Sequence, residues 1–296
     1  MSWTLFVSLR YLFAKRRERF ISVISLISVL GVAVGVAALI VVLSIMTGFD
    51  EEIKEKIIGT YSHIIILKEG PRRDAENAIE RIKGVEDVAG YSVFADKQGL
   101  LKVGDNIFGV LLRAVDPENE PRVTNVKEFV GKGRLDLGRD GIILGSQLKK
   151  NYDVSIGETV TVISPHAKKA KEFTVKDVFN SGRYDYDSNM ALISLEASEE
   201  LYGDSVTGVG VRVRDGFDVN RVKEAVQKRL GYAFSVKTWQ DLDRNLMRAL
   251  AVEKKIMFFI LALIVIVACF NIASTLIMVV MEKTKDIGIL KAVGAA

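Results

Sequence analysis

The chain contains few cysteines and histidines, which are common metal ligands, and too few cysteines for an internal disulfide. It contains a single cysteine, Cys269, and two histidines, His63 and His166, among 296 residues. One cysteine cannot form a disulfide within the chain. The two histidines lie far apart in the sequence and have no cysteine nearby, which argues against a metal site. We expect no metal-binding residues.

Motifs for catalysis are also missing. The sequence has no GxxxxGK[ST] phosphate loop, no GxSxG elbow and no HExxH pair. The most suggestive local cluster is RYDYDSN, where Asp185 and Asp187 alternate with tyrosines. On a strand or turn this spacing puts both carboxylates on one face, and a solvated surface explains them as well as acid/base chemistry does. We expect no catalytic residues and no cofactor bound by this chain.

Charge is absent from two long stretches, 20–46 and 256–281, in a chain that is 49% hydrophobic. Each stretch forms a helix of roughly 40 Å, which is enough to cross a hydrocarbon core of about 30 Å. The first is longer than the apolar region of a cleaved signal peptide, the main alternative. Two buried helices of this kind in a soluble enzyme would need a very large protein around them. The sequence predicts two transmembrane helices.

Basic residues before the first span predict the orientation. Five of them (Arg10, Lys15, Arg16, Arg17 and Arg19) stand against one acid, Glu18. The positive-inside rule then places the N-terminus in the cytoplasm and the residues between the spans outside. This segment alone equals the net charge of +4 of the whole chain, which leaves no basic excess for nucleic acid.

The expected exported domain is flanked by two similar units. The first has a strand at 64–68, a helix at 74–83 and a strand around Tyr91; the second has a helix at 220–230 and a strand from Phe234. Two such units can form one split, ferredoxin-like sheet, although chance similarity of two common units is the alternative. Between them, 96–200 reads as short alternating strands. The predicted fold class is an α+β membrane protein.

Small and polar residues punctuate both spans. Gly31 and Gly35 form a GxxxG pattern in the first, and Asn271 places an amide near the centre of the second. In lipid, small residues let helices approach closely and a polar side chain seeks a partner on another helix. We expect Gly31, Gly35 and Asn271 to serve helix packing. The second span then runs into an amphipathic tail whose charged rim and apolar tip suit a groove in a cytoplasmic protein, or a membrane surface.

Three stretches carry a resemblance to a known family. They are RYLFAKRRERFISVISLISVLGVAVGVAALIVVLSIMTGF, VFNSGRYDYDSNMALISL and ALAVEKKIMFFILALIVIVACFNIASTLIMVVMEKTKDIGILKAVGA. Together they resemble the permeases of lipoprotein-releasing ABC transporters, the LolC/LolE type within the wider MacB-like and FtsX-like group. The resemblance extends over nearly the whole chain.

The resemblance implies a domain plan and a set of partners. The plan is a cytoplasmic N-terminus (1–19), a first transmembrane helix (20–47), a Porter module in two halves (48–95 and 201–250), a Sabre-like β subdomain (96–200), a second transmembrane helix (251–281) and a cytoplasmic coupling helix (282–296). The implied partners are a cytoplasmic ATPase that uses ATP and Mg²⁺, a second permease copy or paralogue, triacylated lipoproteins and membrane lipid. The implied location is the bacterial inner membrane.

The coupling helix carries the family motif residue by residue, with Asp286 where glutamate is usual. The ATPase-coupling residues we expect are Glu282, Lys283, Lys285, Asp286, Ile287, Gly288, Leu290, Lys291 and Gly294. Lipoprotein acyl chains would need an apolar cavity near the outer ends of the spans. For that cavity we expect Leu43, Met46, Phe49, Met257, Phe258 and Leu261.

Two departures from the family pattern stand out. Family permeases have four spans, whereas this sequence reaches only the coupling helix, so we expect a truncated product or a fragment. The hairpin that recruits a periplasmic lipoprotein chaperone is represented only by SPHAKKAKEF, which leaves direct docking of the chaperone open.

The hypothesis from sequence is therefore a permease subunit that releases lipoproteins from the outer leaflet. Three alternatives stay open: a MacB-like mechanotransmission efflux subunit, an FtsX-like regulator of a cell-wall hydrolase, and a membrane-anchored enzyme.

Overall fold

The computed structural model describes residues 19–165 and 167–292. Their side chains are described as well, except those of 19–28, 50–58, 282, 285, 286 and 290. The chain divides into two units. The helical unit comprises 1–50 and 248–296, and the globular unit comprises 51–247. His166 and the ends of the chain lie outside the described residues.

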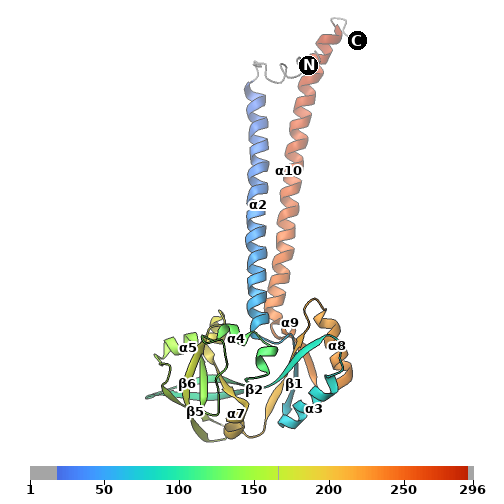
Figure 1. Ribbon diagram of the computed structural model, residues 1–296. Helices are drawn as coiled ribbons and strands as arrows, with labels where there is room; N and C mark the ends of the chain where they lie inside the picture. The colour runs from blue at the N-terminus through green and yellow to red at the C-terminus, as the bar shows by residue number, and fades with distance from the viewer. Residues whose placement is uncertain (1–18, 166, 293–296) are drawn as a thin grey trace, which may run out of the picture. The chain divides into compact units, whose positions relative to one another are not determined.

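Two long helices, α2 and α10, form the described part of the helical unit. They span Arg19–Thr60 and Arg244–Ala292, and in Figure 1 they run side by side, α2 in blue and α10 in orange to red. With 42 and 49 residues they reach roughly 60 and 70 Å at 1.5 Å per residue, well beyond a hydrocarbon core of about 30 Å. Their stretches Val29–Phe49 and Arg244–Met281 are apolar enough to cross a membrane. Each helix is therefore longer than a hydrocarbon core is thick.

One sheet of nine strands organises the globular unit. Its order is β3-β7-β4-β6-β5-β2-β8-β1-β9. The strands are β1 (Ile64–Gly70), β2 (Val88–Val103), β3 (Asn106–Val115), β4 (Gly141–Gly145), β5 (Thr159–Ser164), β6 (Lys169–Phe179), β7 (Met190–Ser194), β8 (Val206–Val213) and β9 (Ser235–Thr238). Most neighbours are antiparallel; β3 pairs with β7 and β4 with β6 in parallel.

Short helices connect and cover these strands. They are α3 (Arg72–Ile82), the 3₁₀ turn η1 (Glu120–Arg122), α4 (Val126–Phe129), α5 (Ser146–Asn151), α6 (Tyr184–Asn189), α7 (Leu195–Tyr202), α8 (Val219–Leu230) and α9 (Trp239–Leu242). Helix α3 follows β1 and α8 follows β8, and each is amphipathic with its apolar side buried. The two predicted strand-helix-strand units are thus present, as β1-α3-β2 and β8-α8-β9.

The apolar core of the globular unit consists of a large cluster and a smaller one. Val211 on β8 is fully buried between Ile64 of β1 and Tyr91 of β2, its partners in the sheet. Ile82 of α3 and Val226 of α8 are also fully buried in the same cluster. Apolar residues recur at helical spacing on α3 and α8 and alternate along the strands, so both patterns meet in one core.

Candidate functional site

The helical unit presents apolar side chains on all sides. In each of its two membrane-compatible helices, the most apolar window of 18 residues contains no residue that is buried within this chain. A cavity of about 420 Å³ lies between α2 and α10. Its walls are formed by Val29, Val32, Ala33, Asn271, Ile272, Thr275 and Leu276. A surface of this kind is suited to lipid or to further helices.

Two polar residues line this cavity. The hydroxyl of Thr275 donates to the carbonyl oxygen of Asn271 at 2.9 Å, within the same helix. This bond satisfies the hydroxyl without a second helix. The Asn271 side chain is exposed at the cavity wall, where a surrounding of lipid would leave its amide without water. Asn271 therefore sits where the predicted packing role requires it, and the role itself stays a prediction.

The glycines of the GxxxG pattern face open space in this chain. A Cβ added at Gly31 or Gly35 would meet no atom within 4 Å. Close packing at these glycines would thus need a helix other than those among the described residues. Their packing role also stays a prediction.

The six residues expected in a lipoprotein cavity are spread along the two helices. Phe49 and Phe258 are 53% and 66% exposed. Leu43, Met46, Met257 and Leu261 are partly exposed. None of the six lines the cavity between α2 and α10. Their exposure leaves them available to acyl chains or to neighbouring helices, so the assignment is still a prediction.

The expected coupling segment continues α10 without a break as far as Ala292. Ile287 is 52% exposed, Lys291 is exposed and Lys283 is partly exposed. A Cβ at Gly288 would meet nothing within 4 Å. The side chains of Glu282, Lys285, Asp286 and Leu290, and all of Gly294, lie outside the described residues. The described part of the segment is an exposed helix that a partner could bind.

A buried arginine, Arg113, organises the polar interior of the globular unit. This β3 side chain donates to the Tyr186 hydroxyl at 2.7 Å and lies 3.6 Å from the carboxylate of Asp96 on β2. Its guanidinium also lies over the Phe94 ring, 4.7 Å from the centroid. Glu120 is buried nearby and accepts a hydrogen bond from the Thr124 hydroxyl at 3.2 Å. These contacts connect β2, β3, η1 and α6.

Burial shifts the pKa values in this cluster. It raises the pKa of Glu120, and the opposing effects of Arg113 and Thr124 do not cancel the rise. It also raises the pKa of the Tyr186 hydroxyl to about 12, against the effect of Arg113. For Arg113 itself, burial acts to lower the pKa, but Asp96, Tyr186 and Glu120 together raise it. An always-charged arginine in a dry interior requires such partners, which identifies the cluster as structural.

The two aspartates of RYDYDSN do not share a face, contrary to the expectation from their spacing. This segment forms the short helix α6, and a helical turn separates side chains that a strand would align. Asp187 is buried and accepts hydrogen bonds from the backbone and hydroxyl of Ser181, at 2.9 and 2.8 Å. Asp185 is exposed and pairs with Arg183 at 2.9 Å. Both carboxylates therefore have structural partners.

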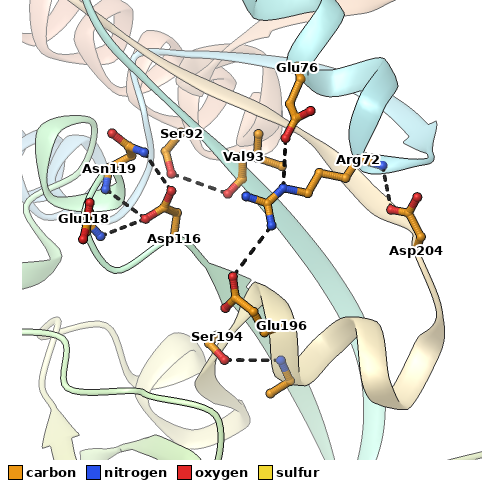
Figure 2. Close-up of polar contacts among 11 residues, drawn as sticks. Arg72, Glu76, Ser92, Val93, Asp116, Glu118, Asn119, Ser194, Glu196 and Asp204 are labelled. Carbon is orange, nitrogen blue, oxygen red and sulfur yellow. Dashed lines mark hydrogen bonds and ion pairs between the residues drawn. The ribbon is translucent and has the colours of Figure 1, made fainter.

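A second arginine, Arg72, connects α3 to α7, as Figure 2 shows. Its guanidinium lies 3.1 Å from Glu76 and 3.7 Å from Glu196, and its backbone N–H donates to Asp204 at 2.8 Å. Nearby, Asp116 accepts hydrogen bonds from Glu118 and Asn119. Burial acts to raise the pKa of Asp116, but these bonds lower it overall. All of these groups fix one loop or helix to another.

Among the described residues, no group of three or more histidine, cysteine, aspartate or glutamate side chains could hold a metal ion. His63 lies just before β1, where its Nδ1 accepts a hydrogen bond from the Val213 backbone at 3.2 Å. Burial lowers the pKa of His63, followed in size by the charge of Arg212. His63 is a structural acceptor just before β1, beside the end of the neighbouring strand β8.

Sequence reasoning missed Arg113, Glu120 and Arg72. One signal was available for Arg113, since a charged residue inside the apolar strand GVLLRAV indicates a paired, buried side chain. Glu76 follows Arg72 by four positions on the same helix, but Glu196 and Asp204 come from distant segments that no local pattern brings to Arg72.

Comparisons with known proteins cover most of the chain. The family model of the MacB-like periplasmic core domain matches residues 25–229. A lipoprotein-releasing system transmembrane protein LolC from Neisseria meningitidis is 32% identical over 97% of this chain and 73% of its own length. LolC from Xylella fastidiosa is 31% identical with the same two coverages. LolE from Haemophilus influenzae is 27% identical over 100% of this chain and 75% of its own length.

The matches to the LolC and LolE relatives extend through both long helices as well as the globular unit, and they confirm the resemblance noted in the sequence. The chain belongs to the family of lipoprotein-releasing system transmembrane proteins of the LolC and LolE type and carries a MacB-like periplasmic core domain.

Proposed function

We propose that this chain is a permease subunit of an ABC transporter that releases lipoproteins from the outer leaflet of the inner membrane. The observation that carries the proposal is the match to LolC of Neisseria meningitidis over 97% of the chain at 32% identity. The polar clusters of the globular unit agree with a transporter subunit, because the partners of Arg113, Asp187 and Arg72 are structural.

In this proposal the N-terminus and the end of α10 are cytoplasmic and the globular unit is periplasmic. The basic residues before the first span support this orientation through the positive-inside rule. The long globular segment between the spans would be exported largely regardless of its own charge.

The globular unit would comprise a split ferredoxin-like Porter module and an inserted Sabre-like subdomain. The strand order β2-β8-β1-β9, with α3 and α8 in contact, supports the first part. The remaining strands, β3 to β7, lie within 96–200 and support the second. The proposed module boundaries are 48–95 and 201–250 around this insert.

ATP and Mg²⁺ would be bound by a separate cytoplasmic subunit, and this chain would bind no cofactor. The uncovered end of α10, with Ile287 and Lys291 exposed, supports a docking role for 282–294. Nucleotide binding in the partner would move the coupling helices, and the long helices would carry this motion to the periplasmic side as a switch between two discrete states.

Lipoprotein acyl chains would enter an apolar space completed by a second permease copy or paralogue and by membrane lipid. Exposed Phe49 and Phe258 support this arrangement. Phe258→Asp should abolish lipoprotein release while the ATPase subunit remains bound, because a charge near the acyl chains is costly in lipid. Unchanged release would remove Phe258 from the cavity.

The decisive experiment reconstitutes the chain with its ATPase and second permease subunit in proteoliposomes that contain a triacylated lipoprotein. We expect ATP-dependent release of that lipoprotein. The pair K285E and K291E should lose the ATPase on purification and should lose release. The matched control is K254E with K255E, which makes the same charge change on the same helix but outside the coupling segment.

Loss of the ATPase in the control pair alone would contradict the coupling assignment. The match to the MacB-like periplasmic core domain favours one other function, mechanotransmission to a separate efflux duct. Transport of a soluble periplasmic substrate in place of a lipoprotein would select that alternative.

A further inference from the structure

The residues that flank the two long helices meet at one side chain, Arg183. Tyr61 is the first residue after α2, and Asp243 is the last residue before α10. Arg183 precedes α6 and lies more than a hundred positions from Tyr61 in the sequence. All three belong to the globular unit.

The guanidinium of Arg183 contacts both helix ends. It lies 5.5 Å from the centroid of the Tyr61 ring and 5.8 Å from that of Tyr186. The same group lies 3.8 Å from the Asp243 carboxylate and 2.9 Å from Asp185. Its side chain is only 16% exposed and that of Asp243 is 34% exposed, so this ion pair is partly shielded from water, whereas Asp185 is exposed. A planar guanidinium can serve rings and carboxylates together, which an ammonium group does less well.

Short contacts hold α6 to the sheet. Asp187 is anchored by two hydrogen bonds from Ser181. A Cβ added at Gly145, at the end of β4, would lie 2.2 Å from the carbonyl oxygen of Asp187, which shows how closely the two backbones approach. Tyr186 accepts its bond from buried Arg113. Helix α6, which Arg183 directly precedes, is therefore held in place by several contacts.

Both helix ends are also closely fitted. At the end of α2, a Cβ on Gly59 would come within 2.8 Å of the Phe129 ring, and the Gly59 carbonyl accepts a bond from the Asn125 backbone at 3.0 Å. At the start of α10, the Asp243 carbonyl accepts the Met247 N–H at 2.9 Å, so Asp243 stands at the N-terminus of that helix. Movement of either helix would therefore change the distance between Arg183 and Tyr61 or Asp243.

The ion pair between Arg183 and Asp243 is longer than a hydrogen bond. The facing atoms, Nη1 and Oδ2, are both buried and have no hydrogen-bond partner among the described residues. Buried polar atoms without partners are unfavourable. A shift of about 1 Å at the start of α10 would convert this contact into a hydrogen bond of ordinary length.

We propose that Arg183 is a positioning residue that fastens the end of α2 and the start of α10 to α6, and thereby makes the globular unit follow both helices. The role of Arg183 in transport rests on the proposed function, whereas its role in holding the two helix ends to α6 does not.

The test measures amide hydrogen exchange of the full chain in lipid nanodiscs. R183A should raise exchange roughly tenfold in both 59–63 and 239–247, since a contact to a charged group is lost at each. D243N should raise it only in 239–247, and Y61L only in 59–63. R183K keeps the charge but loses the planar group, so it should restore protection only in part.

The matched control is R72A, an arginine of the same unit whose partners Glu76, Glu196 and Asp204 do not flank the long helices. It should leave both segments unchanged. Unchanged exchange in both segments of R183A would overturn the proposal. If R183A does not fold, the separate effects of D243N and Y61L decide: loss of protection in each one's own segment supports the proposal, and its absence in both overturns it.

In the reconstituted transporter, R183A should lower the lipoprotein released per ATP hydrolysed several-fold while ATP hydrolysis continues. Equal ratios in R183A and R72A would reject a role in coupling. If the unmodified transporter releases no lipoprotein, the proposed function fails, and the exchange measurement still decides on the fastening by Arg183.

Discussion

The helical unit and the globular unit use apolar residues in opposite ways. In the globular unit, Leu144 on β4 is fully buried and Ile193 on β7 is as well. In the helical unit, Leu263 and Leu276 are 62% and 59% exposed. The globular unit thus has the interior of a water-soluble protein, whereas the helices have a surface matched to lipid.

This difference teaches where each unit obtains its stability. The globular unit buries apolar area from water within one chain, the main favourable term in folding. The helices satisfy their backbone bonds internally but gain little from contact with each other, because lipid is as apolar as their side chains. Substitutions in the globular unit should therefore change stability through the apolar area buried from water. Substitutions in the helices should have little such effect.

The largest expected difference comes from truncating one leucine in each unit. L144A removes fully buried methyl groups and should lower the free energy of unfolding of the globular unit by about 3 kcal/mol. L276A should leave that free energy unchanged. Denaturant titration followed by the fluorescence of buried Trp239, in a Trp3→Phe background, measures both. Equal losses in the two variants would break the comparison.

A pair of glycine substitutions sharpens the same contrast. A Cβ at Gly208 would lie 2.1 Å from the Ile66 carbonyl oxygen on the neighbouring strand, whereas one at Gly35 meets nothing within 4 Å. G208A should cost about 2 kcal/mol through forced displacement of β1. G35A should cost the chain nothing, so any loss it causes in the assembled transporter would report a neighbouring helix that is present only in the complex. Thermal unfolding of the chain alone and of the complex separates these cases.

A smaller effect is expected from acid. Hydrogen bonds from Lys223, then from the Thr238 backbone, lower the pKa of Asp241 from 3.8 to about 2. A carboxylate with a lowered folded pKa contributes stability above pH 3.8, which is lost as the pH falls towards 2. After allowance for solvent screening the contribution is about 1 kcal/mol. D241N should remove this part of the pH dependence, and K223M should reduce it; an unchanged acid titration in both would contradict the assignment.

The smallest effect concerns His63. Its pKa is lowered from 6.5, so the unfolded chain takes up the proton first. Stability of the globular unit is therefore complete above pH 6.5 and declines as the pH falls through that value, by less than about 1 kcal/mol. H63F should flatten the stability profile between pH 5 and 7. A steeper profile in H63F would mean that other groups titrate there.

Much of the globular fold could be predicted from periodicity. The helix expected at 220–230 is α8, Val219–Leu230, and the one expected at 74–83 is α3, Arg72–Ile82. Both are amphipathic, and Asp218 caps α8 by accepting a bond from Asn220. The start of β1 at Ile64 also agrees with the expectation. Local patterns were sufficient because each of these elements has one buried face.

Other features depend on contacts that no local pattern contains. The alternation in RYDYDSN indicated a strand or turn, yet α6 forms because Asp187 is drawn inward by Ser181. The meeting of Tyr61, Arg183 and Asp243 depends on where the sheet brings distant segments. The coupling segment could be expected only from the family resemblance, since an uncovered amphipathic tail fits several partners equally well.

The unbroken course of α10, from Arg244 to Ala292, has a geometric consequence. Each residue turns a helix by about 100°, so the azimuth at which the tail faces a partner is set by the number of residues between it and Asp243. Insertions of seven or eleven residues would shift that phase by only about 20°. An insertion of two residues would turn the tail to nearly the opposite side. Only certain changes in the length of this helix would therefore keep the tail facing the same partner.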